Sequence, residues 1–535
     1  MFQEVFTPLA DVGFDSDRSH LGRDCAAYTE NEDRAHDVFA RLVSEIRILA
    51  LEKDLNVTLE VDPFGNSYAV LEGESDDEIM ICSHLDSVPN GGRFDGVIGV
   101  AAGLEVIKRF IEEDKQPVKT IRVAGFRAEE SSVTGHSCLG SSLATGNFDI
   151  ENLTKRKHDV RGISLRDVLS KMGVTDGKLN ELKERPFIDG NKVVAVVEVH
   201  VEQSPVLESL DKPVGIVSKG IGGARRSDLN FKSELGMESH VGRVLKVTVT
   251  GEAGHSGGLP MNGEVILGQN MDLRRDAVIA VAKFLDSFPG SVNLTNISVP
   301  NGNYNTVPKE CCFELAVTDD FEAENFKAGI EKFLLPGMGV SVEIDDSSRE
   351  VQIIRDDVAK AAMKIITEVD AVGTQMAKEY EGAVRVTFGD VYSIDGEINM
   401  KLDQRRLSNG IADYMKNKVL CILGAIDPND ENLRITEDKV VTSFATPLSE
   451  SVSGIIRESA GELGLDLPEM GSMPGHDIAK VIRAKRSDEE FVNGGMIYVR
   501  GLNKGISHNP DEFSDMKDIE IAVNLLYASV KKMAM

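Results

Sequence analysis

Histidine and carboxylate side chains gather in one short stretch that directly follows an apolar run. The stretch SHLDSVPNGGRFDG, residues 83–96, places His84 and Asp86 directly behind IMIC, and Asp95 comes later in the same loop. Imidazole and carboxylate groups suit divalent ions such as zinc, cobalt or manganese, and such an ion lowers the pKa of a bound water toward neutrality. The stretch is therefore either part of a metal centre at the end of a buried strand or an ordinary polar loop.

Polar clusters of the same kind follow other apolar runs. RAEE follows IRVAGF, HVEQ follows VVAVVEV, and the loops MPGHD and GISHNPDE come near the C-terminus. Each cluster alone reads more simply as a cap, a turn or a solvated loop. In open α/β sheets, however, ligands bind beyond the carboxyl ends of the strands, so clusters at several strand ends favour one shared site. The candidate ligands are His84, Asp86, Asp95, Glu129, Glu130, His200, Glu202, His476, Asp477 and His508.

The adjacent carboxylates Glu129 and Glu130 favour two different roles. Successive residues at a strand end point in different directions. One of the two can therefore bind a metal ion while the other accepts a proton from metal-bound water.

The elements that must position these clusters alternate between helix and strand in the first third of the chain. Residues 34–54 carry apolar side chains at helical spacing, and SYAVLEG and EIMICSHLD have the composition of strands. A helix, VIGVAAGLEVIKRFIEE, and a further strand, KTIRVAGF, follow. This alternation is typical of an α/β fold with a mostly parallel sheet.

The middle of the chain changes to short strands and helices in the order of a small α+β sandwich. We expect a discontinuous metal-binding catalytic domain, residues 1–217 and 444–535, with an inserted accessory domain, residues 218–443, that serves as a lid or in dimerisation. The same order of elements occurs twice, which indicates an internal duplication with repeats 245–347 and 356–443. The alternative is one long insertion, without duplication, in which strands and helices alternate in the same order.

The composition narrows the class of partner. The 535 residues include 88 acidic and 59 basic side chains, for a formal net charge of −29, which repels nucleic acid and anionic membranes. No stretch approaches the roughly 20 apolar residues that span a bilayer, and no signal segment is recognised at the N-terminus. The six cysteines form no CxxC pair. We expect a cytoplasmic protein that acts on a small molecule and binds neither nucleic acid nor a membrane.

Several segments together resemble a known family, and the resemblance covers most of the chain. They are SHLDSVPNGGRFDGVIGVAAGLEVI, AEE…CLGSSLATG, HVEQSPVLE, TGEAGHSGGLPM…RRDAV, GHD and GMIYVRGLNKGISHNPDE. These segments are similar to the dinuclear-zinc amidohydrolases of the aminoacylase and carboxypeptidase superfamily, and within it to allantoate amidohydrolase, N-carbamoyl-L-amino acid hydrolase and yeast-type β-ureidopropionase. The resemblance implies hydrolysis of a linear C–N bond in an N-carbamoyl or ureido-type small molecule by metal-bound hydroxide.

The resemblance also implies a metal site with two divalent ions, zinc first and manganese, cobalt or nickel as alternatives. The implied ligands are His84 and His200 on one ion, Glu130 and His508 on the other, and Asp95 between the two. Asp86 would orient His84 through its second ring nitrogen.

Further residues carry over as groups that act on the substrate. Glu129 would be the general base, and His255 of the accessory domain would stabilise the oxyanion. Gln203 and His476 match positions that line the substrate pocket, and Asn305 matches an asparagine that contacts the substrate carboxylate. The alternative for Gln203 is an ordinary surface glutamine.

The chain departs from the family where an arginine usually binds the substrate carboxylate, because Thr318 stands there. In the second repeat EINMKLDQRRLS ends with Arg405 and Arg406, and one of them, Arg405 first, is the expected replacement. Relatives form homodimers through the accessory domain, whereas a duplicated domain would allow a monomer. The chain also has insertions relative to the family near residues 160–185 and 221–240, and the sequence does not indicate what these insertions do.

Two other functions compete with the hydrolysis of a ureido compound. An exopeptidase, a dipeptidase or an N-acyl-amino-acid deacylase could use the same metals and base. A catalytically silent binding protein is the other alternative, and the presence of all five implied ligands together with Glu129 argues against it.

Overall fold

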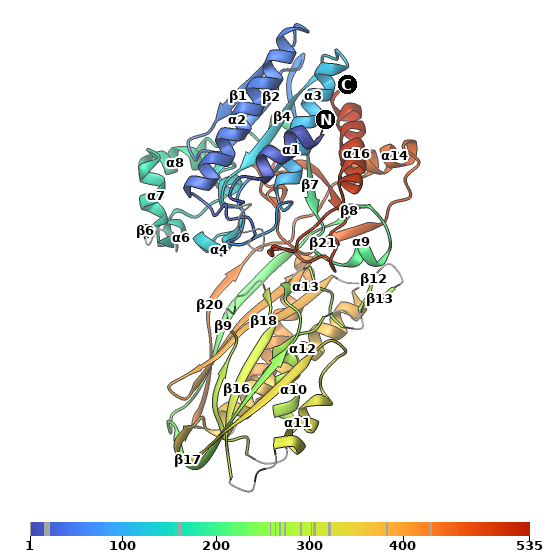
Figure 1. Cartoon of the computed structure of the whole chain (residues 1–535). Helices are drawn as coiled ribbons and strands as arrows, with labels where there is room; N and C mark the ends of the chain where they lie inside the picture. The colour runs from blue at the N-terminus through green and yellow to red at the C-terminus, as the bar shows by residue number, and fades with distance from the viewer. Residues whose placement is uncertain are drawn as a thin grey trace. The chain divides into compact units, whose positions relative to one another are not determined.

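The computed structural model describes residues 2–14, 22–155, 157–158, 163–256, 258–262, 264–266, 269–271, 274–288, 291–300, 302, 306–318, 321, 323–380, 383–426 and 431–535. The chain forms two compact units, a first unit of residues 1–221 and 446–535 and a second unit of residues 222–445 (Figure 1). Both units combine helices with sheets, which confirms the predicted mixed α/β class. Among the described residues, no helix has the length and apolar character needed to cross a membrane.

The first unit is built on an eight-stranded sheet of order β1-β2-β4-β3-β7-β22-β8-β21. Its strands are β1 (Val57–Val61), β2 (Ser67–Leu71), β3 (Ser75–His84), β4 (Lys119–Phe126), β7 (Val193–Val201), β8 (Val214–Ile221), β21 (Glu469–Ser472) and β22 (Asn493–Val499). Strand β3 pairs in parallel with β4 and β7, and β7 pairs in parallel with β22. The late strand β22 thus lies next to the middle of the sheet.

Helices cover this sheet and bury an apolar core against it (Figure 1). The longer ones are α1 (Phe2–Ala10), α2 (Glu30–Leu51), α3 (Val97–Glu112), α14 (Glu450–Glu462) and α16 (Met516–Ala534). Short elements complete the unit: α4 (Ser131–Thr134), α5 (Leu139–Ala144), α6 (Ile150–Lys155), β5 (Lys157–His158), β6 (Ile163–Ser164), α9 (Val206–Ser209) and α15 (Ile478–Ile482).

The predicted insertion near residues 160–185 contributes helices α7 (Leu165–Lys171) and α8 (Asp176–Glu184) to the first unit. Their apolar side chains, among them Leu169 and Leu182, join Leu139 and Leu143 of α5 in a separate buried cluster. The insertion therefore supports the segment that follows the RAEE cluster.

The second unit contains another eight-stranded sheet, of order β17-β10-β16-β14-β18-β19-β9-β20. Its strands are β9 (Gly223–Ser233), β10 (Glu238–Thr250), β14 (Leu294–Ser298), β16 (Glu310–Val317), β17 (Gly339–Ile353), β18 (Val384–Ile394), β19 (Glu397–Arg406) and β20 (Leu433–Thr442). The predicted insertion near residues 221–240 includes β9, an interior strand between β19 and β20. Alternating burial along β9 explains this position, because every second residue faces the core despite the many charges.

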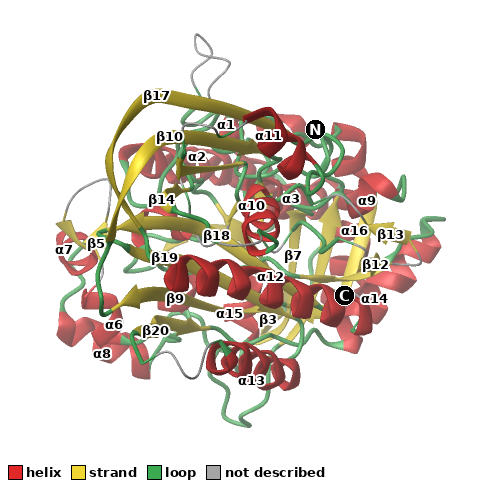
Figure 2. Cartoon of the chain, turned by 90° about the horizontal axis from the view of Figure 1, so that it is seen from below, coloured by secondary structure: helices red, strands yellow, loops and turns green. Residues whose placement is uncertain are grey.

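The helices in the described part of the second unit are α10 (Ala277–Asp286), α11 (Ala323–Glu331), α12 (Asp356–Glu379) and α13 (Asn409–Ala425). Helices α10 and α12 pack against each other and lie beside one another in Figure 2. Small two-stranded sheets pair β11 (Gly254–His255) with β15 (Thr306–Val307), and β12 (Glu264–Ile266) with β13 (Gln269–Met271).

Glycine allows α3 to approach the strands that carry the predicted ligands. A Cβ atom on Gly99 would lie 2.3 Å from the Val199 carbonyl oxygen of β7 and 2.6 Å from the Ser83 Cβ of β3. Both contacts are far below van der Waals distance, and the carbonyl belongs to a central strand that cannot shift freely.

We expect Gly99→Ala to lower the free energy of unfolding by about 1–3 kcal/mol, because the added methyl group over-packs the helix–sheet contact. Gly461→Ala in α14 is the matched control, since nothing lies within 4 Å of a Cβ atom there. The measurement is urea unfolding followed by circular dichroism. Equal unfolding midpoints for the two variants would contradict the prediction.

Candidate metal centre

The predicted ligands of the first unit lie at the carboxyl ends of neighbouring strands. His84 is the last residue of β3, His200 lies one residue before the end of β7, and Glu130 follows β4. His508 lies in the loop between β22 and α16. Because β4, β3, β7 and β22 are neighbours that pair in parallel, these four ends meet at one edge of the sheet.

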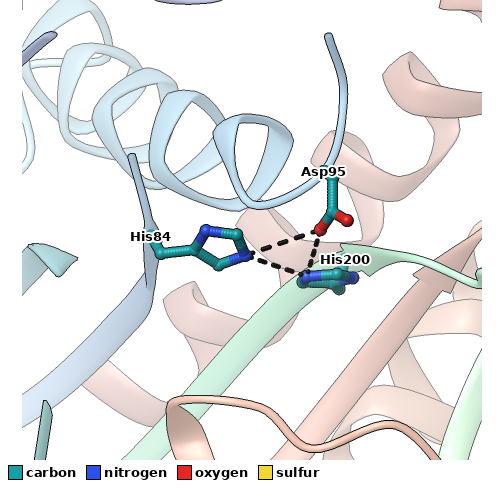
Figure 3. A group of neighbouring side chains, drawn as sticks. All are labelled: His84, Asp95 and His200. Carbon is teal, nitrogen blue, oxygen red and sulfur yellow. Dashed lines mark hydrogen bonds and ion pairs between the residues drawn. The ribbon is translucent and has the colours of Figure 1, made fainter. Parts of the chain in front are cut away.

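One oxygen of Asp95 faces two imidazole rings (Figure 3). Asp95 Oδ1 lies 3.1 Å from His200 Nε2 and 3.5 Å from His84 Nε2, and the two nitrogens are 3.5 Å apart. His200 Nδ1 lies 2.9 Å from the carbonyl oxygen of Val201, which can only accept a hydrogen bond. His200 therefore donates through Nδ1, and Nε2 is the nitrogen that faces Asp95.

The other oxygen of Asp95 faces a second group. Asp95 Oδ2 lies 3.4 Å from His508 Nε2, and that nitrogen lies 3.1 Å from Glu130 Oε1. In each of the two groups the candidate ligand atoms are within 4.8 Å of one another, and Asp95 is common to both. His508 has φ of +58°, a left-handed backbone that costs energy for a residue with a Cβ and is typical of functional sites.

This donor set fits divalent metal ions. Imidazole nitrogens and carboxylate oxygens are the ligands that zinc and its neighbours use in proteins. Asp95 Oδ1 is buried, and no residue in the described part of the chain donates a hydrogen bond to it. A cation between the imidazoles would satisfy this oxygen, which otherwise carries the cost of an unpaired buried acceptor.

A third group with ligand spacing is already occupied by hydrogen bonds. Its members are Glu198, His200 and His476. Glu198 accepts hydrogen bonds of 3.0 Å from the Ser83 hydroxyl and from the Ile478 amide. His476 Nε2 lies 2.8 Å from Ser472 Oγ and 3.0 Å from Tyr498 OH. We therefore interpret this group as structural support beneath the two groups that share Asp95.

Opposite charges at the site shift its pKa values apart. Burial lowers the pKa of His84, but the Asp86 and Asp95 carboxylates outweigh burial and raise it well above the usual value. Burial acts in the same way on His200, and Asp95 raises that pKa to about 9. Burial raises the pKa of Asp95, and the facing histidines bring it well below its usual range. A divalent ion that binds here must displace protons, so its affinity depends on pH.

Asp86 links the ends of β3 and β4. Its Oδ1 accepts a 3.0 Å hydrogen bond from the Glu129 amide, and its Oδ2 accepts one of the same length from the Glu130 amide. Oδ1 also lies 3.4 Å from His84 Nδ1. The side chain is thus within reach of the ring that it was predicted to orient, while it fixes the backbone of both glutamates.

Glu129 is buried, and its carboxylate accepts a hydrogen bond of 3.0 Å from the Cys138 thiol. Burial raises the pKa of Glu129 to about 7, with the Glu130 charge adding to the increase and His84 opposing it. A carboxylate that titrates near neutral pH can both accept and return a proton. Ala128 and Cys138, on either side of Glu129 in the chain, have φ of +53° and +52°.

Glu512 and Ser507 hold Asp95 in place, and no role was predicted for either residue. Glu512 Oε1 accepts 3.0 Å hydrogen bonds from the amides of Phe94 and Asp95, and Oε2 accepts one of 2.6 Å from Ser507. A Cβ atom on Gly92 would lie 2.0 Å from Glu512 Oε1, which explains the second glycine of the sequence GGRF. In the sequence, only that glycine and Glu512 of NPDE point to this contact, and neither residue alone assigns a role to Glu512.

Gln203 and His476, predicted to line the substrate pocket, both lie beside the ligands. Gln203 Nε2 donates a 2.7 Å hydrogen bond to Asp95 Oδ2, and the residue has φ of +56°. The His476 ring lies 4.4 Å from the His200 ring between centroids. Gln203 is buried, so it is no ordinary surface glutamine. A contact of either residue with substrate stays a prediction.

Glu202 and Asp477, two of the initial candidate ligands, belong to none of the metal-ligand groups that the described residues form. Glu202 accepts hydrogen bonds from the amides of Val206 and Leu207 at the start of α9, and burial raises its pKa to about 8. Asp477 accepts a 2.5 Å hydrogen bond from Ser141. Both therefore take the structural roles that are common for acidic residues in loops.

The remaining predicted residues belong to the second unit. His255 is buried on β11 and pairs with Thr306 of β15, and its Nδ1 accepts a hydrogen bond from the Gly258 amide. Asn305 lies outside the described residues. Arg405 is the last residue but one of β19 and donates a 2.8 Å hydrogen bond to Asp403 Oδ2, which also accepts one of 2.7 Å from Ser256. The segment that carries His255 is thus linked through Ser256 and Asp403 to Arg405.

Known proteins resemble this chain over most of its length. The sequence model of peptidase family M20/M25/M40 matches residues 80–532. An N-carbamoyl-L-amino-acid amidohydrolase from Pseudomonas sp. (strain NS671) is 26% identical over 90% of this chain and 88% of its own length. An allantoate deiminase from Arabidopsis thaliana is 26% identical over 86% of this chain and 70% of its own. The crystal structure of a hydantoinase/carbamoylase family amidase from Burkholderia ambifaria, 21% identical, superposes with a TM-score of 0.60, covering 100% of this chain and 97% of that one.

We expect Glu512→Ala to lower the affinity for a divalent ion about 10–100-fold, as the loss of a group that holds a ligand usually does. The Asp95 carboxylate keeps its chemistry in this variant but loses the acceptor that fixes its backbone. Competition against a chromogenic chelator measures the affinity. Asp511→Ala, at an exposed neighbour, is the control, and equal affinities in the two variants would show that Glu512 does not act on the ligands.

Proposed function

The chain belongs to peptidase family M20/M25/M40, and on that premise we propose that it hydrolyses a linear C–N bond in an N-carbamoyl or ureido-type small molecule. One observation carries the proposal: a carboxylate shared by two ligand groups lies at the same strand ends as a buried glutamate whose pKa is about 7. Two relatives support the substrate class, because their names specify N-carbamoyl-L-amino acids and allantoate.

We propose that the two ligand groups each hold one divalent ion. Zinc is the first expectation, and manganese, cobalt or nickel are alternatives. Bound there, the ions would supply Lewis acidity, which polarises the scissile carbonyl group and acidifies water. His84 and His200 would hold one ion, Glu130 and His508 the other, and Asp95 both. The distances of 3.1–3.5 Å between Asp95 and its three histidines support this assignment.

Glu129 is the proposed general base. It takes a proton from the attacking water and delivers it to the leaving nitrogen, which otherwise departs as an unstable anion. Its burial and its position beside Glu130 support the role, since a pKa of about 7 allows both proton transfers. Asp86 positions the pair through their backbone amides.

His255 and Arg405 are the proposed groups of the second unit that bind substrate. The imidazole of His255 stabilises the negative charge that develops on the carbonyl oxygen. Arg405 takes the place of the arginine that is missing at Thr318 and pairs with the substrate carboxylate. Arg405 suits this role better than Arg406, because it shares a face of β19 with Asp403, which is linked to the His255 segment, whereas Arg406 alternates to the opposite face.

We also propose that the second unit is a duplicated accessory domain inserted into the catalytic domain. The first four-stranded half of its sheet has the order β17-β10-β16-β14 and the second half β20-β9-β19-β18, read from each edge inward. Numbered along the chain within each half, both orders are 4-1-3-2, and the halves meet where β14 pairs with β18. This symmetry supports a duplication, but its repeats differ from the predicted repeats 245–347 and 356–443. Strand β9, which lies outside both predicted repeats, becomes the first strand of the second repeat.

The duplication would make a partner subunit unnecessary. The continuous eight-stranded sheet already joins two copies of one motif, as a homodimer through this domain would.

Six free cysteines support the proposal of a cytoplasmic location for the protein.

We expect a monomer with a mass near 58.2 kDa by size-exclusion chromatography with multi-angle light scattering. The reason is that β14 and β18, which form the junction in the proposed duplication, already pair with each other. A stable dimer at micromolar concentration would contradict the prediction.

The choice between a ureido hydrolase and a peptidase or deacylase rests on the product. N-carbamoyl amino acids and allantoate are tested against dipeptides and N-acetyl amino acids in the metal-loaded enzyme, with ammonia measured. Ammonia from the ureido compounds, without cleavage of dipeptides, supports the proposal. Cleavage of only dipeptides or N-acetyl amino acids favours the alternative, and no turnover on any of them favours a silent binding protein.

We expect Glu129→Gln to lower turnover by about 10²–10⁴-fold, because the amide cannot accept the proton. Metal content, measured by atomic absorption, should stay near that of the wild type, since Glu129 is not a proposed ligand. Glu130→Gln is the matched control and should lose metal. The reverse pattern would show that the two glutamates have exchanged roles.

A further inference from the structure

A cavity of about 360 Å³ lies in the second unit, along α10 and α12. Residues of both helices line it, and the segment 333–338 contributes further residues. None of the residues proposed above to bind metal or substrate lines it. Its volume is within the range of sites that bind small molecules.

One wall of the cavity is apolar. It is formed by Ile279, Ala280, Phe333, Leu335 and Met338. Three of these large apolar side chains, those of Phe333, Leu335 and Met338, are only partly buried. An apolar wall that stays accessible inside a cavity suits the side chain of a ligand.

The opposite charges of Lys283 and Asp370 face each other in the cavity. Lys283 Nζ of α10 donates a 3.0 Å hydrogen bond to Asp370 Oδ2 of α12. The bond uses one of three ammonium protons and one of two carboxylate oxygens, so each group keeps capacity for a ligand. Asp370 is buried, and Thr374, one helical turn further along α12, adds a hydroxyl group.

Arg274 provides a second cationic group in the cavity lining, and it is almost completely buried. Its Nη2 pairs with Asp276 Oδ2 at 2.8 Å, and its Nη1 donates to the carbonyl oxygen of Val386 at 2.7 Å. Its buried Nε has no acceptor among the residues that the structure describes. A buried guanidinium N–H without an acceptor is costly, and a ligand oxygen would remove that cost.

We propose that this cavity binds a zwitterionic α-amino acid with an apolar side chain. The ligand carboxylate pairs with Lys283 and Arg274, the ligand ammonium group pairs with Asp370, and the side chain lies against the wall of Phe333, Leu335 and Met338. A simple anion or a simple cation fits less well, because either would leave one member of the Lys283–Asp370 pair facing a like charge.

The proposed site has a consequence if the proposed function also holds. An α-amino acid is the class of product that hydrolysis of an N-carbamoyl amino acid releases. The cavity would then sense product at the contact between α10 and α12, at a place that neither His255 nor Arg405 lines. This consequence rests on the proposed function, whereas binding itself does not.

Isothermal titration calorimetry of the full-length protein with L-leucine and L-methionine tests the site. Titrations are done after treatment with a chelator, which separates this cavity from product binding at the metal centre. We expect saturable binding of one amino acid per chain, and at least about tenfold weaker binding of N-acetyl-L-leucine and of L-leucinamide, each of which lacks one charge. No binding of either amino acid, or equal binding of the two analogues, would overturn the proposal.

Two variants with different effects on the cavity identify it as the site. Asp370→Asn keeps the shape but removes the partner of the ammonium group, and Thr374→Leu fills space while it leaves both ion pairs intact. Each is expected to weaken binding at least about tenfold. Lys360→Gln, on an exposed part of α12 with its own pair to Asp356, is the matched control and should bind as the wild type does. Unchanged binding in both cavity variants would place the amino acid elsewhere.

The effect on catalysis is measured separately with an N-carbamoyl amino acid as substrate. Inhibition or activation by L-leucine that disappears in Thr374→Leu indicates regulation through the cavity. Absence of turnover with saturable binding would leave the binding site intact and contradict only the proposed function.

Discussion

The Asp95 carboxylate offers one oxygen to His84 and His200 and the other to His508, at distances of 3.1–3.5 Å. Three imidazoles around one buried carboxylate can keep this arrangement only if the carboxylate cannot turn. Glu512 prevents the turn by accepting a hydrogen bond from the Asp95 amide, while Gln203 donates one to Oδ2. The strand ends, the glycines of the loop and the strained backbone at Gln203 and His508 all serve this geometry.

The residues of the two candidate ligand groups could be predicted because their chemistry and their place after strands are both visible in the sequence. His84, Glu130 and His200 stand at the ends of apolar runs, and a parallel sheet gathers such ends. Glu512 could not be predicted in the same way, since an acidic residue in a polar loop looks the same whether it is solvated or buried. Its role depends on the absence of a side chain at Gly92, a relation between loops that only the folded chain reveals.

The accessory part of the chain was harder to predict. The segment that contains strand β9 was expected to be an insertion without an assigned role, yet β9 is an interior strand whose alternate residues are buried. Which strands pair cannot be read from local composition, because each strand here could satisfy its backbone with several partners. Alternation along β19 places Arg405 on the face of Asp403 and Arg406 on the opposite face. The register with β9 decides which of these two faces is turned toward the core, because a shift by one residue would turn every side chain of the strand over.

The position of β9 between β19 and β20 has a consequence for how the chain acquires its structure during synthesis. Strand β9 ends at Ser233, whereas β19 begins at Glu397 and β20 at Leu433. Strands β10 to β17 form a contiguous segment that can collapse locally as it leaves the ribosome. Strand β9 leaves earlier but has to wait for partners that are synthesised last, with both of its edges unpaired. The lysine and arginine side chains of β9 reduce the risk of aggregation during this interval, which gives a reason for the charge on this interior strand.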